Sequence, residues 1–232
     1  MVVSYAAPLL AVRGGPFLGD TLAMGQAALD LYGATGSRTW LATAASAGSY
    51  IAANFTDPAG GFTTTLSDET SVGVFLKRYK PLDEQVQVAR FANRLHRYTG
   101  RGADLAMAEH AGRYVTSDAV LELPRPLPGV LLVDGELAVG PTHITVVGSK
   151  SDATARSLHA TARAYPGVYK RVDWWDRSEG KLPNPDIEYP ELDRAAAFAC
   201  TNRLCSLPSF SGDELASTVK RMVELSRPGS TP

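Results

Sequence analysis

Apolar positions recur with helical spacing through much of the first 140 residues of the chain, although residues 63–81 have no helical period. The stretch at residues 28–51 (ALDLYGATGSRTWLATAASAGSYI) keeps this spacing on both sides of Gly36, and it occurs a second time at residues 92–115 (ANRLHRYTGRGADLAMAEHAGRYV). A glycine supplies the left-handed backbone that often ends a helix. Each copy therefore predicts a helix, a stop at Gly36 or Gly100, and a second helix, so the sequence predicts two helical hairpins built alike.

The second helix of each copy has a smooth face of small residues. These are Ala44, Ala47 and Gly48 in the first copy and Ala108, Ala111 and Gly112 in the second. Such a face lets a neighbouring helix approach closely. Because one hairpin cannot bury its own apolar faces, repeated hairpins predict a stacked or ring-like array. An incomplete ring exposes the apolar flank of its outermost hairpin, which predicts self-association into a homo-oligomer.

The same periodicity places the other helices of this half. One begins at Asp20 or Thr21, residue types that cap helix N-termini, and runs to Gly36. Another covers residues 83–98 with Asp83 as its N-cap, and a shorter apolar segment at 129–139 forms one more helix.

The pattern changes after Pro141, where β-branched residues become dense. The predicted elements are a strand at 143–148, a helix at 153–165, strands at 169–175 and 195–200, and a helix at 214–225 capped by Ser211 or Asp213. A strand, a helix and a second strand in succession are typical of a βαβ unit. We therefore expect a mainly α protein with two parts, a helical-hairpin segment at 1–140 and a small α/β subdomain at 141–232.

Charge and hydropathy exclude two classes of partner. The 232 residues include 23 Lys and Arg against 24 Asp and Glu, a net charge of −1, so the chain lacks the basic excess of a nucleic-acid-binding protein. The apolar opening at 2–12 is far shorter than the ~20 residues that span a bilayer, and no basic segment precedes it. We expect no membrane partner and a cytoplasmic location, or a periplasmic one if the chain belongs to a longer exported protein.

Short blocks along nearly the whole chain carry a family resemblance. They are Phe17–Asp20, Ala28–Tyr32, Gly60–Phe62, Lys80–Asp83 and Ala197–Pro208. Together they resemble the C-terminal half of the spermatogenesis-associated thioredoxin-domain proteins, a largely uncharacterised family. The resemblance implies a six-hairpin, glycosidase-like (α/α) toroid that binds or processes a carbohydrate, as a glycosidase or epimerase would. The alternative that it implies is a non-catalytic accessory domain for a thioredoxin-like partner in the same chain or another.

The chain departs from the pattern of that family in three ways. It has no Cys-x-x-Cys motif and about half of the helices that a six-hairpin ring requires. Glu84-Gln85-Val86-Gln87 also replaces the Pro-Ser-Gly-Asn motif expected there, which would alter any ligand pocket that this motif shapes. We therefore expect a partial ring, and we predict no cofactor.

Carboxylates at helix starts are the candidate catalytic residues. Asp20, Asp83 and Glu84 are predicted to face the ring centre, with Lys80 as a substrate-binding residue and Arg78 nearby. Glycoside hydrolysis uses two carboxylates, one as acid and one as base or nucleophile. The alternative is purely structural, because Asp20 and Asp83 also suit helix N-caps and favour the helix dipole.

Two tryptophans within Asp173-Trp174-Trp175-Asp176 are candidates for substrate binding. Indole faces beside carboxylates suit stacking on a sugar ring. The alternative is a strand end at which Trp174 packs into the core and Trp175 packs against the Pro-rich loop. The turn at Gly148–Asp152 could hold a phosphate between strand and helix, but the pattern favours the alternative, a turn that caps the following helix.

The two cysteines form the last candidate site. On a continuous strand the sulfurs of Cys200 and Cys205 would lie ~16 Å apart, so they can meet only if residues 201–204 turn, which Asn202 favours. A redox-active disulfide and two reduced, half-buried thiols both stay open. No metal site is predicted, because none of the four histidines has zinc-ligand spacing to these cysteines.

Overall fold

The computed structural model describes residues 16–66, 79–124, 128–184, 186–201 and 204–226. Within these ranges the protein is mainly helical with one small sheet, which confirms the predicted fold class at that level. The chain divides into two compact units. We call residues 33–36 together with those from 139 onward the α/β unit, and the rest the helical unit. The predicted boundary at 140/141 lies beside this division.

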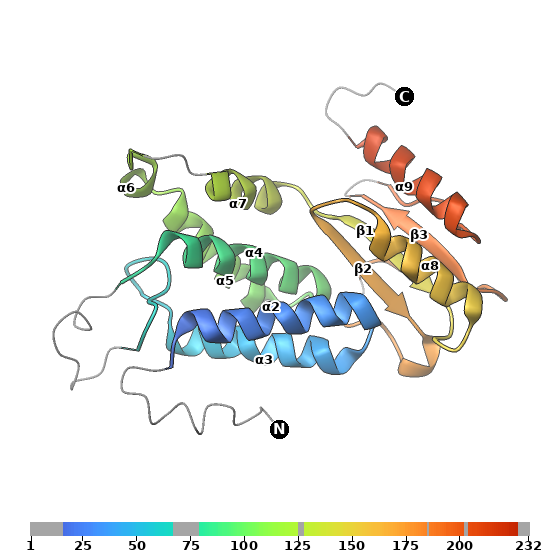
Figure 1. Cartoon of the computed structure of the whole chain (residues 1–232), viewed down its shortest axis with the longest axis horizontal. Coiled ribbons are helices and arrows are strands. Elements are labelled where there is room, and N and C mark those ends of the chain that lie inside the picture. Colours follow the sequence, from blue (N-terminus) through green and yellow to red (C-terminus); the bar gives the residue numbers. More distant parts are fainter. Residues whose placement is uncertain (1–15, 67–78, 125–127, 185, 202–203, 227–232) are drawn as a thin grey trace. The chain divides into compact units, whose positions relative to one another are not determined.

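The described elements of the helical unit are helices (Figure 1). They are α2 (Leu18–Thr35), α3 (Arg38–Asn54), α4 (Leu82–Thr99), α5 (Gly102–Val115), α6 (Asp118–Leu121) and α7 (Pro128–Ala138). Helices α2 and α3, and then α4 and α5, are the two hairpins that the sequence repeat predicts. Gly36 and Gly100 separate their helices with φ of 65° and 69°, the left-handed conformation expected of both.

The hairpins pack through the glycines of their smooth faces. A Cβ placed on Gly48 of α3 would lie 2.8 Å from Leu95 Cδ2 of α4, which is closer than packed carbons allow. Gly112, the equivalent residue of the second copy, has the same relation to α7, with Leu137 Cδ1 at 2.7 Å. Helix α7 therefore packs on α5 as α4 packs on α3. The two hairpins of the repeat therefore pack against each other and against α7.

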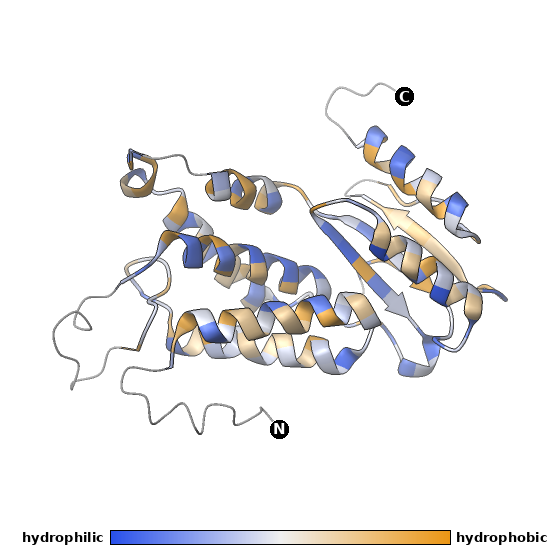
Figure 2. Cartoon of the chain, in the orientation of Figure 1, coloured by the Kyte–Doolittle hydropathy of each residue, from blue (hydrophilic) through white to orange (hydrophobic). Residues whose placement is uncertain are grey.

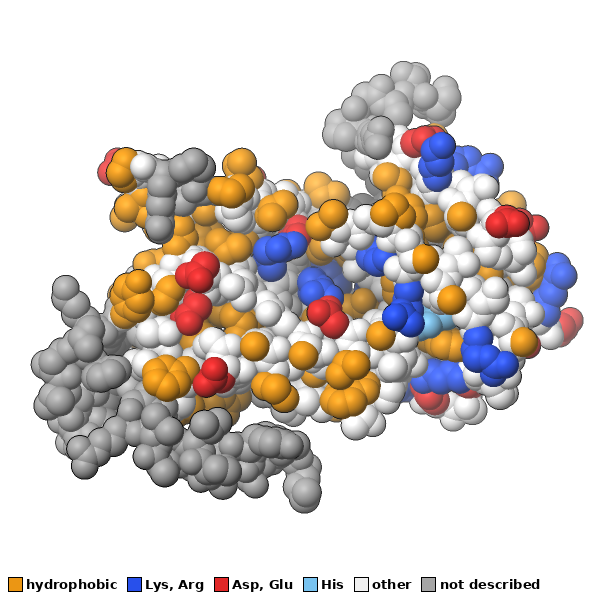
Figure 3. All heavy atoms as spheres, viewed as in Figure 1, with side chains coloured by type: hydrophobic (Ala, Val, Ile, Leu, Met, Phe, Trp, Pro, Cys, Tyr) orange, Lys and Arg blue, Asp and Glu red, His pale blue; other side chains and the backbone are white. Residues whose placement is uncertain are grey.

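The outer helices of the helical unit expose large apolar side chains. Leu131 is 75% exposed and Leu132 46% exposed on α7, and Leu121 at the end of α6 is 53% exposed. Figure 3 shows hydrophobic side chains gathered over α6 and α7. Among the described residues no helix is both long and apolar enough to cross a membrane.

The α/β unit is built on a three-stranded sheet in the order β2-β1-β3. Its elements are β1 (Thr142–Val147), α8 (Ala153–Ala164), β2 (Lys170–Trp175), a 3-10 turn (Arg177–Glu179), β3 (Ala196–Cys200) and α9 (Gly212–Leu225). Strands β1 and β2 are parallel and joined by α8, which confirms the predicted βαβ unit, whereas β3 is antiparallel to β1. The side chain of Asp152 caps α8 and that of Ser211 caps α9.

The two faces of this sheet differ in chemistry. One face is an apolar core in which Ile144 and Val146 of β1 pack with Leu158 of α8 and Leu215 of α9. The opposite face carries polar side chains, and β2 is largely blue in Figure 2 although its residues are mostly buried. Because successive strand residues point to opposite faces, the alternation in β1 and β2 separates an apolar core from a buried polar layer.

Candidate functional site

The three candidate carboxylates come together at the starts of two helices. Asp20 lies in the first turn of α2, and Asp83 and Glu84 lie in the first turn of α4. The charges of Asp83 and Asp20 both raise the pKa of Glu84, so the three groups are close enough to interact. A Cβ on Gly19 would lie 3.2 Å from Glu84 Oε1, which shows that this glycine leaves room for the carboxyl.

Glu84 is the half-buried member of this group. Thr64 Oγ1 donates to Glu84 Oε1 at 3.1 Å, whereas Glu84 Oε2 is buried and has no hydrogen-bond partner among the described residues. Burial is the largest cause that raises the pKa of Glu84, and the Thr64 hydrogen bond opposes it. A half-buried carboxyl with an unused oxygen can hold a proton and present it to a ligand.

The structure corrects the capping roles of Asp20 and Asp83. Helix α2 begins at Leu18 and α4 at Leu82 with Pro81 as its N-cap, so neither aspartate caps a helix. Leu18 is fully buried and Leu82 packs against the core, and burying these residues carries each helix beyond the predicted start. Both aspartates are exposed first-turn acids, where they still interact favourably with the helix dipole.

Lys80 does not bind to the carboxylates of Asp20, Asp83 and Glu84, which we call the carboxylate cluster. Its Nζ pairs with Asp57 at 2.9 Å, donates to the Gly60 carbonyl at 2.5 Å and lies 5.2 Å from the centre of the Tyr114 ring. These contacts hold the turn that follows α3. Arg78 lies outside the described residues. The substrate-binding role predicted for Lys80 stays a prediction.

Gln85 and His110, which were not candidate site residues in the sequence, also hold the turn that follows α3. Gln85 accepts from the Phe62 backbone N–H and donates to the Phe62 carbonyl, both at 2.7 Å. His110 Nε2 lies 3.1 Å from the carbonyl oxygens of Asp57 and Gly61. Gln85 lies within Glu84-Gln85-Val86-Gln87, the four residues at which the chain departs from the pattern that it resembles, and it has a structural role here. Its signal in the sequence was a polar residue on the buried side of a helix.

Trp174 and Trp175 point to opposite faces of the sheet. Trp174 packs in the apolar core against His159, and its indole N–H donates to the Gly148 carbonyl at 3.0 Å. Trp175 lies near Tyr189 of the Pro-rich loop and donates to the Gly180 carbonyl at 3.1 Å. These contacts are the ones expected if Trp174 packs into the core and Trp175 packs against the Pro-rich loop. The burial of Trp174 counts against sugar stacking, which stays a prediction for both residues.

The turn at Gly148–Asp152 already binds its own partners. Asp176 Oδ2 accepts from the Lys150 backbone N–H at 2.8 Å, and Lys150 Nζ pairs with Glu179 at 2.5 Å. Asp152 accepts from two backbone N–H groups of α8. A carboxylate thus occupies a position that a phosphate would need, so the arrangement favours the capping alternative.

The two cysteines form a disulfide across a tight turn. The sulfurs of Cys200 and Cys205 are 2.08 Å apart, and the Thr201 N–H donates to the Leu204 carbonyl at 2.9 Å. The chain therefore makes the turn on which the pairing depended. Cys200 is only 1% exposed at the end of β3, whereas Cys205 is exposed. The disulfide thus has one buried and one accessible end.

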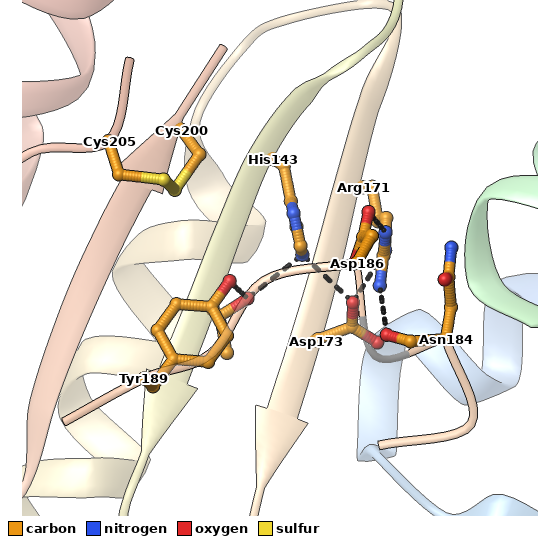
Figure 4. A network of polar contacts seen from close by, with 9 residues as sticks. His143, Arg171, Asp173, Asn184, Asp186, Tyr189, Cys200 and Cys205 are labelled. Atoms are coloured by element: carbon orange, nitrogen blue, oxygen red, sulfur yellow. Dashed lines mark hydrogen bonds and ion pairs between the residues drawn. A yellow bond between two sulfur atoms is a disulfide. The ribbon is translucent and has the colours of Figure 1, made fainter. Parts of the chain in front are cut away.

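A buried polar network lies beside the disulfide (Figure 4). His143 Nε2 lies 2.9 Å from Asp173 Oδ2 and 2.9 Å from Thr145 Oγ1, which in turn lies 2.7 Å from the Tyr189 hydroxyl. Arg171 donates to Asp173 at 2.6 Å. These residues come from β1, β2 and the Pro-rich loop, and we refer to them as the sheet network.

Arg171 ties the Pro-rich loop to the sheet network. It donates to Asp186 at 2.7 Å and to the Asn184 carbonyl at 3.5 Å. Burial lowers the pKa of Arg171, but the nearby carboxylates of Asp173 and Asp186 raise it more. Burial also raises the pKa of Tyr189. Arg171 is therefore a fixed cation and Tyr189 a neutral phenol in this layer.

The sequence contains a signal for this network. Polar residues occupy alternate positions of two predicted strands, namely His143 and Thr145 in β1 and Arg171 and Asp173 in β2. The register pairs His143 with Arg171 and Thr145 with Asp173, so all four lie in adjoining rows on one face. Among the described residues no group of three or more His, Cys, Asp or Glu side chains is placed to hold a metal ion.

No protein-family model matches the chain, and no curated protein matches it significantly. The resemblance to the thioredoxin-domain family therefore stays a prediction.

Proposed function

We propose that the helical unit is part of an (α/α) toroid that binds or processes a carbohydrate, with Glu84 as the proton donor. The observation that carries this proposal is the Glu84 carboxyl, which has a raised pKa and an unused oxygen beside the exposed acids Asp20 and Asp83. The family resemblance supports the proposal, since it implies the same class of ligand.

The chemistry follows from the different environments of these carboxyls. A half-buried glutamic acid keeps its proton to higher pH and can donate it to a glycosidic or ring oxygen. Asp83 is exposed and supplies the second carboxyl that glycoside hydrolysis uses as base or nucleophile. Neither group needs a cofactor for this work.

A thermal-shift panel of mono- and oligosaccharides tests binding directly. At about 10 mM, a sugar with a Kd near 1 mM raises the stability by roughly 1.4 kcal/mol, which is about 3–6 °C for a chain of this size. Glu84→Gln and Asp83→Ala should abolish the shift, and the exposed Asp134→Asn on α7 should keep it. A flat panel on well-folded protein would count against the carbohydrate function.

The exposed apolar side chains of α6 and α7 support the proposed incomplete ring. Leu131 and Leu132 are exposed on α7, as expected for a helix that lacks a neighbouring hairpin. We propose self-association through this flank. Leu131→Glu should remove any dimer seen by light scattering, and a monomeric wild-type chain would count against it.

An accessory domain for a thioredoxin-like partner is the second candidate. It rests on a separate observation, the disulfide whose Cys205 end is exposed. Such a partner carries a dithiol, which reacts with accessible disulfides.

A further inference from the structure

We propose that Cys200–Cys205 is a thiol–disulfide exchange site at which a dithiol attacks Cys205 and Cys200 is the leaving group. The inference rests on the α/β unit alone and is independent of the carbohydrate function. It extends the accessory role by naming the atoms that react and the order in which they do so.

The direction of attack follows from burial. A thiolate attacks a disulfide sulfur and forms a mixed disulfide while the other sulfur leaves. Cys200 is 1% exposed within β3, whereas Cys205 is exposed after the turn. A partner can therefore reach Cys205, and the buried Cys200 becomes the leaving group.

The exchange is balanced in electrons and protons. The attacking thiolate of the dithiol bonds to Cys205 Sγ, the Cys200–Cys205 bond breaks, and Cys200 carries the electron pair. The second thiol of the dithiol then attacks its own bound sulfur and releases Cys205 as a thiolate. Two electrons and the two protons of the dithiol pass to the protein, and the dithiol becomes a disulfide.

The hairpin that holds both cysteines does not depend on the disulfide. Ser206 N–H donates to the Ala199 carbonyl at 2.8 Å, and Ala197 and Ser209 exchange two backbone hydrogen bonds at 2.8 Å. These bonds keep the two thiols close after reduction. The site can therefore be oxidised again without refolding.

Mapping the mixed disulfide tests the order of attack. The folded protein is treated briefly with glutathione, quenched with acid and digested, and the glutathionylated cysteine is identified by mass spectrometry. We expect modification of Cys205 to exceed that of Cys200 by at least about tenfold, as the burial of Cys200 requires. Equal labelling of both, or no reaction until the protein is unfolded, would overturn the proposal.

Reduced thioredoxin separates this proposal from the accessory role. If dithiothreitol reduces the site through Cys205 and thioredoxin does so faster at equal concentration, both stand. If dithiothreitol reacts as expected but thioredoxin does not, the exchange site stands and the thioredoxin-like partner is wrong.

Discussion

The carboxylate cluster of the helical unit and the sheet network of the α/β unit bury charge in opposite ways. In the network, Asp173 accepts from Arg171 and lies beside His143, so its charge is compensated from two strands. In the cluster, Glu84 has one hydroxyl donor and two further acids as neighbours. A compensated buried charge specifies structure, whereas an uncompensated one is available to a ligand. The contrast favours a structural role for the network and supports the binding role that we propose for the cluster.

The largest expected effect comes from removing the central cation of the network. Arg171→Met leaves Asp173 and Asp186 facing each other without a counter-charge, which should cost about 3–5 kcal/mol of unfolding free energy. Urea unfolding followed by tryptophan fluorescence measures this, because Trp174 and Trp175 report on the α/β unit. Arg94→Ala breaks the exposed pair with Asp30 and should cost under about 1 kcal/mol. Equal losses would remove the distinction between the two pairs.

His159 should make the α/β unit sensitive to acid. Burial, and then the charge of Arg163, lower the pKa of His159 to about 4. The unfolded chain takes up this proton near pH 6.5 and the folded one only near pH 4, so stability falls as the pH falls through that window, by about 2–3 kcal/mol. His159→Phe should flatten the pH dependence of the urea midpoint between pH 6.5 and 4. An unchanged slope in that variant would show that His159 is not the cause.

Reducing the disulfide should destabilise the α/β unit by about 2 kcal/mol, as expected for a loop of this length on the chain-entropy model. Parallel melts with and without a phosphine reductant measure the change. Cys205→Ser should reproduce it and make the reductant irrelevant. A loss far above this value would mean that the hairpin depends on the disulfide, contrary to its backbone hydrogen bonds.

Substituting alanine for glycine should distinguish closely packed helix positions from positions that face open space. Gly48→Ala drives a methyl group into Leu95, which should cost about 1–2 kcal/mol after the gain in helix propensity. Gly135→Ala on α7 meets nothing within 4 Å and should stabilise by about 0.5–1 kcal/mol. Thermal unfolding of the pair gives both signs at once. A stabilised Gly48 variant would show that the helices can move apart at no cost.

The smallest expected effect comes from Glu84→Gln. The pH dependence of stability that Glu84 produces has the opposite sign to that of His159. The pKa of Glu84 is raised in the folded state, so the folded chain binds the proton more tightly than the unfolded chain does. Stability therefore rises as the pH falls through the raised pKa and is complete below the ordinary value of 4.5. Glu84→Gln should remove this contribution, and the difference between the two proteins should shrink toward acid pH. A difference that grows instead would contradict the burial of this carboxyl.

The sequence predicted the scaffold better than the sites. Helix ends at Gly36 and Gly100 and the strands around α8 were predictable because they depend on local backbone and periodicity. Helix starts were less so, since Leu18 and Leu82 extend their helices by packing against distant residues. The sheet network was missed because His143 and Asp173 are thirty positions apart and meet only through strand register.

The equivalence of Gly48 and Gly112 has a consequence for engineering. Each glycine leaves space for a leucine of a neighbouring helix. Leu95 of α4 packs against Gly48, and Leu137 of α7 packs against Gly112. Because this glycine–leucine contact forms between two pairs of helices, it should also form between a third pair. Splicing another copy of residues 92–115 into the helical unit should therefore yield a longer array with no redesign of the contact surfaces, as modular repeat proteins allow.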